Sequence, residues 1–261
     1  MISLYDFDTK LPGRSLSPFV WKIRFALNMK DIEHQTHWIP FSKVAKVLEQ
    51  QGIPRSTEAP VHYGNGRTVP ALYDSSTGIK MSDSRPILAY LDATYTNSPK
   101  LLIRPKGDAQ LETLVADAFN PSWGIPFAMM RPIWTLMGPK IVLEGFDGED
   151  AVNYRPRVEE ALKMTVEDFV HDKVGQERYR HEAREAFRAA DEWLGRARKL
   201  HGGRWALGDA ITLADIELGT ALVFIASILG EKDELWVEIV SGWDGGRWGT
   251  YWDLIKQYRQ V

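Results

Sequence analysis

The sequence predicts an α/β domain over residues 1–95 and an all-helical domain over residues 107–261, joined by a linker over residues 96–106. Three observations predict this division. Short segments with the apolar alternation of strands lie in the first part, between candidate helices. The linker segment contains an Asn and two prolines, a composition typical of a connection. Beyond it, almost every apolar pattern has helical spacing.

In the first part the predicted elements follow the order β-α-β-α-β-β-α. A helix is expected to begin at Ser17-Pro18, because Ser is a good N-cap and Pro a good first helical residue. Another is expected to begin at Asp83-Ser84. Pro70 is expected at the start of its strand, since a central proline would break the ladder. Such a mixed order is typical of folds with one sheet. The strands are predicted over residues 2–7, 34–39, 69–73 and 79–82, and a short helix over 42–51.

The second part is predicted to be a series of helices. Apolar residues recur at helical spacing between residues 111 and 118, between 158 and 169 and between 179 and 194. The segment 213–229 is apolar nearly all round, which indicates a central, buried helix. We expect prolines to interrupt helical continuity up to residue 139. These prolines are Pro121, Pro126, Pro132 and Pro139.

Composition excludes several classes of protein. The 261 residues are 44% hydrophobic and 26% charged, as in ordinary globular proteins. The 32 basic and 35 acidic residues give a net charge of −3, so no basic excess exists to bind nucleic acid. Without cysteine the chain has no disulfide and no Cys nucleophile, and six scattered His give no metal site. The longest uncharged apolar run, 218–230, is too short to cross a membrane. Residues 1–6 do not have the pattern of a signal peptide, so we expect a cytoplasmic protein.

Four motifs in order resemble one family. They are Ser-Pro-Phe-Val-Trp-Lys-Ile-Arg at 17–24, Thr-Val-Pro-Ala-Leu at 68–72, Ser-Asp-Ser-Arg-Pro-Ile at 82–87 and Leu-Gly-Asp-Ala-Ile-Thr-Leu-Ala-Asp at 207–215. Together they are similar to the cytosolic glutathione transferases of the serine type. The first motif and Ala-Tyr-Leu-Asp-Ala-Thr-Tyr at 89–95 resemble the etherase-like branch, which includes bacterial lignin β-etherases and fungal FuA-type transferases. The resemblance implies a thioredoxin-like first domain, an all-helical second domain and a homodimer.

The resemblance assigns catalysis to Ser17. A hydroxyl at a helix N-terminus donates a hydrogen bond to the glutathione thiolate, and the helix end favours an anion. Plain N-capping is the alternative role for this residue. Ser15, in the same loop, is a second candidate for the thiolate donor. Tyr5 is a third, because other classes of the family use a tyrosine near the end of the first strand, although its place inside the strand favours a core role.

The same resemblance places glutathione on two further segments. The bond before Pro70 is expected to be cis, which presents the backbone of Val69 to the cysteinyl part of glutathione like an added strand. Asp83 and Ser84 are expected to hold the γ-glutamyl end, the carboxylate on its ammonium and the hydroxyl on its carboxylate. No motif selects the cation for the glycyl carboxylate. The candidates are Lys43, Lys46, His62 and Arg67.

Aromatic and sulfur-containing side chains predict where the second substrate binds. Residues 119–136 are rich in them, and aromatic groups stack well on planar ligands. The expected pocket residues are Phe119, Trp123, Phe127 and Met130. An ordinary core role is the alternative, as it is for Trp243, Trp248 and Trp252 near the end of the chain. By contrast, Thr212 and Asp215 have capping-box spacing and are expected to be structural.

The expected function is therefore conjugation of the glutathione thiolate to hydrophobic aromatic electrophiles, with cleavage of β-aryl ethers as a related reaction. Glutathione is the co-substrate and no metal is expected. The main alternative is a non-catalytic ligandin that binds plant or wood phenolics on the same fold. A regulatory protein that keeps only the glutathione site is a third, and the intact motifs at 17, 69–70 and 83–84 favour an enzyme over it.

Overall fold

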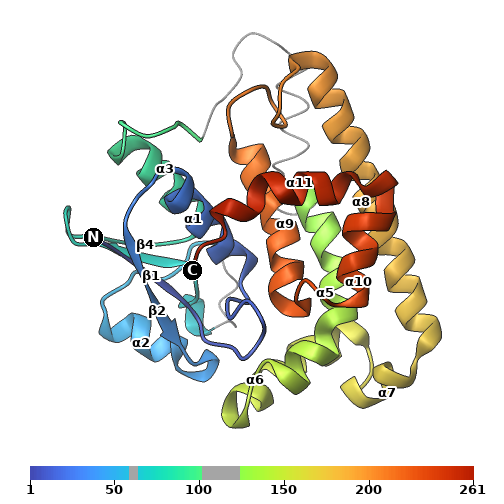
Figure 1. Ribbon diagram of the computed structural model, residues 1–261. Coiled ribbons are helices and arrows are strands. Elements are labelled where there is room, and N and C mark those ends of the chain that lie inside the picture. Colours follow the sequence, from blue (N-terminus) through green and yellow to red (C-terminus); the bar gives the residue numbers. More distant parts are fainter. Residues whose placement is uncertain (59–63, 102–123) are drawn as a thin grey trace.

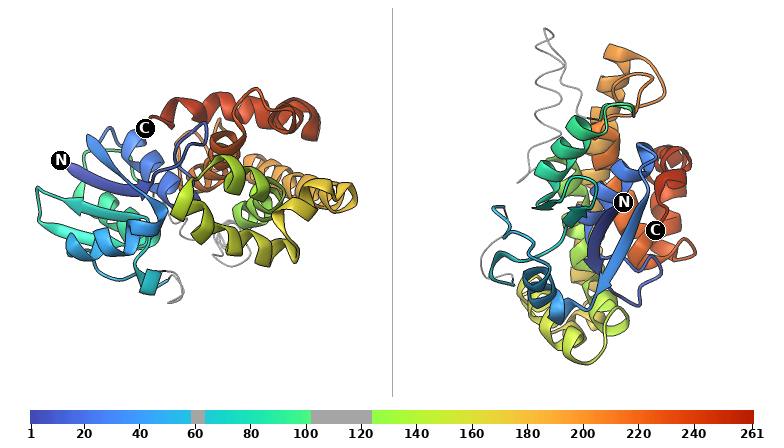
Figure 2. Two further views of the ribbon diagram at one scale, coloured as in Figure 1. Left: turned by 90° about the horizontal axis from the view of Figure 1, so that it is seen from below. Right: turned by 90° about the vertical axis from the view of Figure 1, so that its left-hand side faces the viewer.

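A computed structural model describes residues 1–58, 64–101 and 124–261. A small mixed sheet with its helices forms one side of the molecule and a body of helices forms the other (Figure 1). The end of the chain returns from the helical body to the sheet side, where it lies near α1 (Figures 1 and 2). This is the thioredoxin-like domain plus helical domain that the sequence predicts. Within the described residues no helix is both long and apolar enough to cross a membrane.

The sheet has four strands in the order β2-β1-β3-β4. β1 (Ile2–Phe7) is parallel to β2 (His34–Ile39) and antiparallel to β3 (Ala71–Asp74), which pairs with β4 (Ile79–Ser82). β3 begins after Pro70 and not at 69, because Pro has no N–H to give to the ladder. The register pairs Ala71 with both Tyr5 and Ser82.

Two helices of the first domain begin where the sequence predicts. α1 (Pro18–Met29) has Ser17 as its N-cap, and α3 (Ser84–Thr94) has Asp83. The two helices pack against each other, and α1 also packs against β1 and against α9 of the helical body. The predicted helix at 42–51 is a 3₁₀ turn, Phe41–Lys43, followed by α2 (Val44–Gln50). A further 3₁₀ turn covers Gly64–Gly66.

The helical body is built around two neighbouring helices. α5 (Ile125–Glu144) packs against α6, α8 and α9. α9 (Leu213–Leu229) is buried along almost its whole length, as its uniform apolarity predicts. The remaining helices are α6 (Gly148–Leu162), α7 (Val166–His171), α8 (Lys173–His201), α10 (Glu234–Val237) and α11 (Arg247–Ile255). Shorter turns cover Glu238–Gly242, Trp243–Gly246 and Lys256–Tyr258.

The expected interruption by prolines is wrong for α5. This helix runs through Pro132 and Pro139 without a break, and Pro126 occupies its first turn. Each internal proline removes one backbone hydrogen bond, but the buried faces against α8 and α9 hold the segment helical. The sequence predicts one helical face between residues 158 and 169. The structure has two helices there, because Lys163 takes a left-handed conformation, with φ 60°, and ends α6.

Buried polar contacts fix α1 to α3, to the linker and to the helical body. Lys30 at the end of α1 has no exposed side-chain surface, and its Nζ lies 2.7 Å from an Asp92 carboxylate oxygen and 2.7 Å from the Pro99 carbonyl. Lys22 of α1 forms a largely buried ion pair with Glu217 of α9, at 2.6 Å. In the β1–α1 loop, the Gly13 N–H donates to the Ser227 carbonyl of α9 at 2.8 Å. The first domain is thus fixed on α9 both through α1 and through the loop that precedes it.

Residues 102–106 of the predicted linker and the apolar face between 111 and 118 lie outside the described residues.

Candidate functional site

One edge of the sheet brings the predicted site segments together. β1 and β4 both end there and β3 begins there, because Ala71 pairs with Tyr5 on one side and with Ser82 on the other. Val69-Pro70 precedes β3 and Asp83-Ser84 follows β4 at this edge. The loop that leaves β1 at the same edge leads to Ser17 at the start of α1. The ends of β1 and β4 and the start of β3 thus lie at the edge from which the chain continues to α1 and α3.

Ser17 is buried at the N-terminus of α1. Its Oγ accepts a long hydrogen bond, 3.4 Å, from the Val20 N–H. No acidic side chain lies in the first turn of the helix. The partial positive charge of the helix end therefore has no carboxylate of its own first turn to neutralise it. A hydroxyl that accepts one weak bond still has its proton to donate, so the geometry suits an incoming anion such as a thiolate.

Of the two alternative thiolate donors, Ser15 is less exposed than Ser17, whereas Tyr5 and Ser17 are each 5% exposed. Ser15 has no exposed surface. Its carbonyl accepts from the Trp21 indole N–H at 3.3 Å, and its hydroxyl has no hydrogen-bond partner within the described residues. Tyr5 is also buried, with its ring stacked on His37 at 5.1 Å between centroids. Burial raises the pKa of Tyr5, and the nearby Tyr73 raises it further by a smaller amount. These surroundings favour a core role for Tyr5, and the unpartnered hydroxyl keeps Ser15 as the second candidate.

A fully buried ion pair lies beneath the loop that carries Ser17. Arg24 of α1 donates to a carboxylate oxygen of Asp6 and to the Thr36 hydroxyl, both at 3.1 Å, and neither Arg24 nor Asp6 has exposed surface. The guanidinium lies over the rings of Trp21 and Trp38, at 4.8 and 5.3 Å. Burial raises the pKa of Asp6 and lowers that of Arg24, and the pairing opposes both shifts. The pair fixes α1 to β1 and β2 directly below the loop.

The peptide bond between Val69 and Pro70 is cis, as the resemblance implies. Val69 is buried and stands two residues before the start of β3. It therefore lies at the sheet edge described above.

Asp83 takes a conformation that is rare for a residue with a side chain, with φ 72° and ψ 133°. Backbones of this kind cost about 1–3 kcal/mol and cluster at functional sites. Its carboxylate accepts from the Thr57 N–H at 2.8 Å, from the Thr57 hydroxyl at 3.1 Å and from the Ser56 hydroxyl. Ser84, the first residue of α3, is almost fully buried. Sequence reasoning missed Ser56 and Thr57, and no local pattern connects them with a residue 26 positions later.

The basic candidates for the glycyl carboxylate differ in their contacts. Lys43 pairs with Glu149 of α6 at 2.6 Å, in an exposed ion pair. Arg67 donates to the Ile53 carbonyl at 2.5 Å and to Glu49 at 3.3 Å. Lys46 is exposed on α2, and His62 lies outside the described residues. The described geometry favours none of them.

The residues predicted to bind the second substrate are partly described. Phe127 is 41% exposed and Met130 is buried, both near the start of α5, whereas Phe119 and Trp123 lie outside the described residues. The three tryptophans near the chain end are core residues. Phe187 meets Trp243 and Trp248 edge to face, at 5.1 Å each, and Trp236 meets Trp252 at 4.9 Å.

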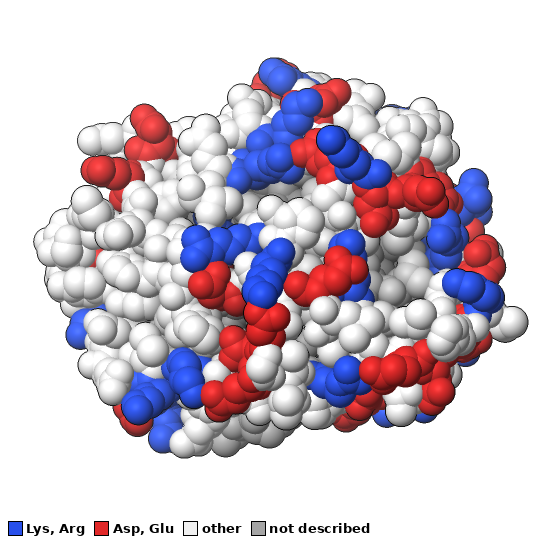
Figure 3. Space-filling model, turned by 60° about the horizontal axis from the view of Figure 1, so that its bottom comes forward, with Lys and Arg blue, Asp and Glu red and all other residues white. Residues whose placement is uncertain are grey.

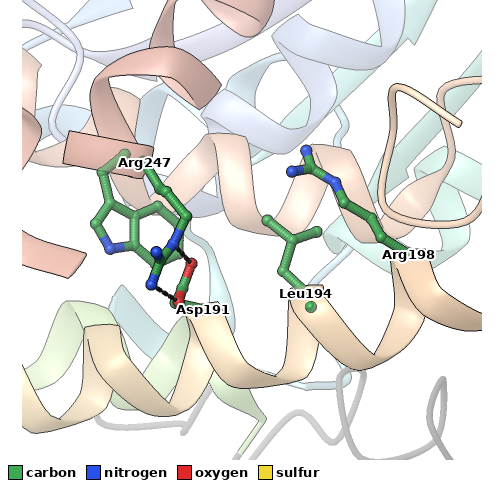
Figure 4. A pocket seen from close by; sticks show the side chains of 6 residues that line it. Asp191, Leu194, Arg198 and Arg247 are labelled. Carbon is green, nitrogen blue, oxygen red and sulfur yellow. Dashed lines mark hydrogen bonds and ion pairs between the residues drawn. The ribbon is translucent and has the colours of Figure 1, made fainter. Parts of the chain in front are cut away.

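Charges of both signs are interspersed over the face shown in Figure 3, without a broad basic patch. Within residues 1–58, 64–101 and 124–261 no group of three or more His, Cys, Asp or Glu side chains is placed to hold a metal ion. A cavity of about 200 Å³ lies between α8 and the start of α11, where Arg247 faces Asp191 in a two-pronged ion pair, 2.6 Å at Nε (Figure 4). Trp248 lines it, but none of the residues predicted to bind glutathione does.

Known protein families match both parts of the chain. The glutathione S-transferase N-terminal domain matches residues 11–99 and the C-terminal domain matches residues 122–258. A curated relative, the glutathione S-transferase-like protein ustS of Aspergillus flavus, is 30% identical over 122 residues, which are 44% of this chain and 42% of that protein. The match thus spans less than half of that relative's length.

Solved structures match the whole chain. A glutathione S-transferase of Ceriporiopsis subvermispora, in complex with glutathione, is 26% identical with a TM-score of 0.81, over 100% of this chain and 98% of that one. The glutathione transferase GSTFuA2 of Phanerochaete chrysosporium is 23% identical with the same coverage and a TM-score of 0.81, which establishes the shared fold. These similarities agree with the branch that the sequence motifs indicate.

Proposed function

Because the chain belongs to the glutathione S-transferase family, we propose that it is a serine-type transferase that joins the glutathione thiolate to hydrophobic aromatic electrophiles. The observation that carries the proposal is the start of α1. There Ser17 stands at a helix end that has no acidic residue in its first turn, at the sheet edge shared with Val69-Pro70 and Asp83-Ser84.

In the proposed reaction the Ser17 hydroxyl donates to the glutathione sulfur, and the helix end favours the thiolate over the thiol. The thiol proton is lost to solvent. The sulfur then attacks the electrophilic carbon of the second substrate, a carbon–sulfur bond forms, and the leaving group departs with its electron pair. A halide leaves as the ion. From a β-aryl ether, a phenolate leaves and takes up a proton.

Each part of glutathione has a proposed position in this site. The backbone of Val69 pairs with the cysteinyl residue, and Ser84 with the amides of α3 receives the γ-glutamyl carboxylate. Asp83 is oriented by Ser56 and Thr57, and we assign it to the γ-glutamyl ammonium. The second substrate is proposed to lie against the start of α5, near Phe127 and Met130, with Phe119 and Trp123 completing its pocket. We also propose a cytoplasmic homodimer, as is usual in the family.

The decisive test is Ser17→Ala. Loss of one hydrogen bond to a charged group, worth about 1.5–3 kcal/mol, should slow turnover of 1-chloro-2,4-dinitrobenzene about ten- to a hundredfold and raise the pKa of bound glutathione. Glutathione affinity should change much less, since the peptide contacts remain. The thiolate is followed by its ultraviolet absorbance across pH. Ser15→Ala is the matched control and should keep near-normal turnover.

Two results would contradict the proposal. If Ser15→Ala loses turnover and Ser17→Ala does not, the thiolate donor is Ser15. If wild-type protein turns over neither the aryl halide nor a β-aryl ether yet binds aromatic ligands tightly, the protein is a ligandin. The role of Asp83 is tested separately, because Asp83→Ala should weaken retention on immobilised glutathione by about 2 kcal/mol.

A further inference from the structure

The loop that leads into Ser17 is held by a side chain of the helix that follows it. The indole N–H of Trp21, in α1, donates to the Ser15 carbonyl at 3.3 Å. Trp21 and Ser15 are both buried, so the contact is shielded from water. Between Ser15 and Ser17 stands only Leu16, which is itself a core residue. The contact therefore fixes the chain directly before the residue proposed to donate to the thiolate.

The indole of Trp21 is in turn oriented by Arg24. The Arg24 guanidinium lies 4.8 Å from the centre of the Trp21 ring and 5.3 Å from that of the Trp38 ring. Asp6 and Thr36 accept hydrogen bonds from this guanidinium, at 3.1 Å each. A planar guanidinium that is fixed in this way and lies over aromatic rings restricts how the rings can turn. This packing keeps the indole N–H directed at the loop.

The same group of side chains contacts the loop a second time. The Arg14 guanidinium lies 4.4 Å from the centre of the Trp38 ring. Arg14 and Ser15 are neighbours, so two successive residues of the loop are held by one group. A buried ion pair such as Arg24 with Asp6 is weak evidence for stability, because the desolvation of two charges offsets their attraction. A positioning role fits this pair better than a stabilising one.

We infer that Trp21 is a positioning residue for the transferase reaction: its indole N–H fixes the Ser15 carbonyl and thereby the place of the Ser17 hydroxyl. The inference rests on the proposed function, and adds to it a residue that is too buried to touch either substrate. A hydrogen bond weakens steeply when its donor moves out of line. A loop that is free to shift at Ser15 therefore lowers the share of bound glutathione that is present as thiolate.

The test compares Trp21→Phe, which keeps a buried ring and removes the N–H, with Trp243→Phe. Trp243 is as buried as Trp21, at 1% exposed, and its indole N–H donates to Glu238 in the helical body at 2.9 Å. Trp21→Phe should raise the pKa of bound glutathione by about 0.3–0.7, which lowers turnover of 1-chloro-2,4-dinitrobenzene about two- to fivefold below that pKa. Its affinity for S-methylglutathione, which has no thiol, should not change, because the peptide contacts remain. Trp243→Phe should alter none of the three quantities.

A double variant separates positioning from a merely structural role. If Trp21 acts through Ser17, Trp21→Phe adds nothing to the rise in pKa that Ser17→Ala causes, whereas independent effects would add. Arg24→Lys keeps a cation for Asp6 and loses the planar contact with Trp21, so it should raise the pKa in the same direction by a smaller amount. This variant carries the test if urea unfolding shows that Trp21→Phe does not fold.

Two results would overturn the inference. In one, the folded variants at Trp21 and Arg24 titrate like wild type while Ser17→Ala does not. In the other, the effects of Trp21→Phe and Ser17→Ala are fully additive. Failure of the proposed function gives a different result, because Ser17→Ala itself would then titrate like wild type, and the inference would fall with it.

Discussion

The N-termini of α1 and α9 use similar local chemistry in opposite ways. At α9, Asp215 forms a capping box with Thr212 and has no exposed surface. Its carboxylate accepts from the Ala206 N–H at 2.8 Å, the Thr212 N–H at 2.9 Å and the Tyr251 hydroxyl at 2.9 Å. At α1, Ser17 makes one long bond and the first turn has no acid.

The two helix starts differ in whether the chain itself supplies an anion. An N-terminus favours a negative charge, and α9 satisfies this need with a carboxylate from its own chain. The chain leaves the same need unmet at α1, where the sheet edge also presents Val69 and Ser84. α2, α5 and α11 also begin without an acid in the first turn, so it is the neighbouring Val69 and Ser84 that single out the start of α1.

The largest effect on stability is expected when the carboxylate at the start of α9 is removed. Asp215→Ala removes the acceptor of several buried donors, each of which costs about 1–3 kcal/mol when left unpaired, so the free energy of unfolding should fall by at least about 3 kcal/mol. Urea unfolding measures it. Asp209→Ala, an exposed acid in the same turn, is the control and should change stability by less than about 0.5 kcal/mol. Equal losses in the two variants would show that α9 does not depend on its own anion.

A second effect on stability is expected at Asp74, at the end of β3. Its carboxylate also accepts several hydrogen bonds from other groups of the protein. Burial raises the pKa of Asp74, but hydrogen bonds from Ser76, Tyr95 and Tyr90 outweigh it and lower the pKa to about 2. Tyr95 donates at 2.6 Å and Tyr90 at 2.7 Å. A folded-state pKa below the unfolded value of 3.8 gives stability that is complete above that value and is lost as pH falls toward about 2.

Wild-type protein should therefore be more stable than Asp74→Asn at pH 6, and the difference should shrink at pH 3. Urea midpoints at the two pH values provide the measurement. An Asp209→Asn control should show a difference from wild type that is the same at both. A gap for Asp74→Asn that does not narrow in acid would mean that the hydrogen bonds, and not the charge, stabilise the hairpin.

The smallest effect is expected from giving α1 an anion of its own. Phe19 is 47% exposed in the first turn, so Phe19→Glu places a carboxylate there with little loss of packing. The charge should stabilise the helix by about 0.3–1 kcal/mol and raise the pKa of bound glutathione by about 0.2–0.7. Absorbance titration of the bound thiolate measures the shift against a Phe19→Gln control. Identical titrations of the two variants would remove the helix end from the proposed mechanism.

What the sequence predicts well is encoded in neighbouring residues. The starts of α1 and α9 follow from Ser17-Pro18 and from the spacing of Thr212 and Asp215, and the strands follow from short alternating runs. The continuity of α5 through Pro132 does not, because packing against α8 and α9 outweighs a local penalty. Local signals and distant packing compete there, and packing prevails.

The same distinction between local signals and distant contacts applies to the candidate site. The Ser17 and Asp83-Ser84 positions are visible as helix-start signals, whereas their roles rest on family resemblance. The hydrogen bonds from Ser56 and Thr57 to Asp83 join residues that are 27 and 26 positions apart. They can be seen only in the folded structure. The buried pair of Arg24 and Asp6 is hidden for the same reason, since nothing in the spacing shows that both side chains face the same side of β1.

The meeting of Gly13 with Ser227 bears on how such proteins diversify. A Cβ at position 13 would lie 2.4 Å from the Ser227 Cβ, so neither backbone has room to spare. Substitutions in the β1–α1 loop and in the last turns of α9 therefore constrain each other. Recombination between relatives that crosses between the two domains separates this pair, and the hybrid tolerates the exchange where both parents keep glycine in the loop and a small residue on the helix.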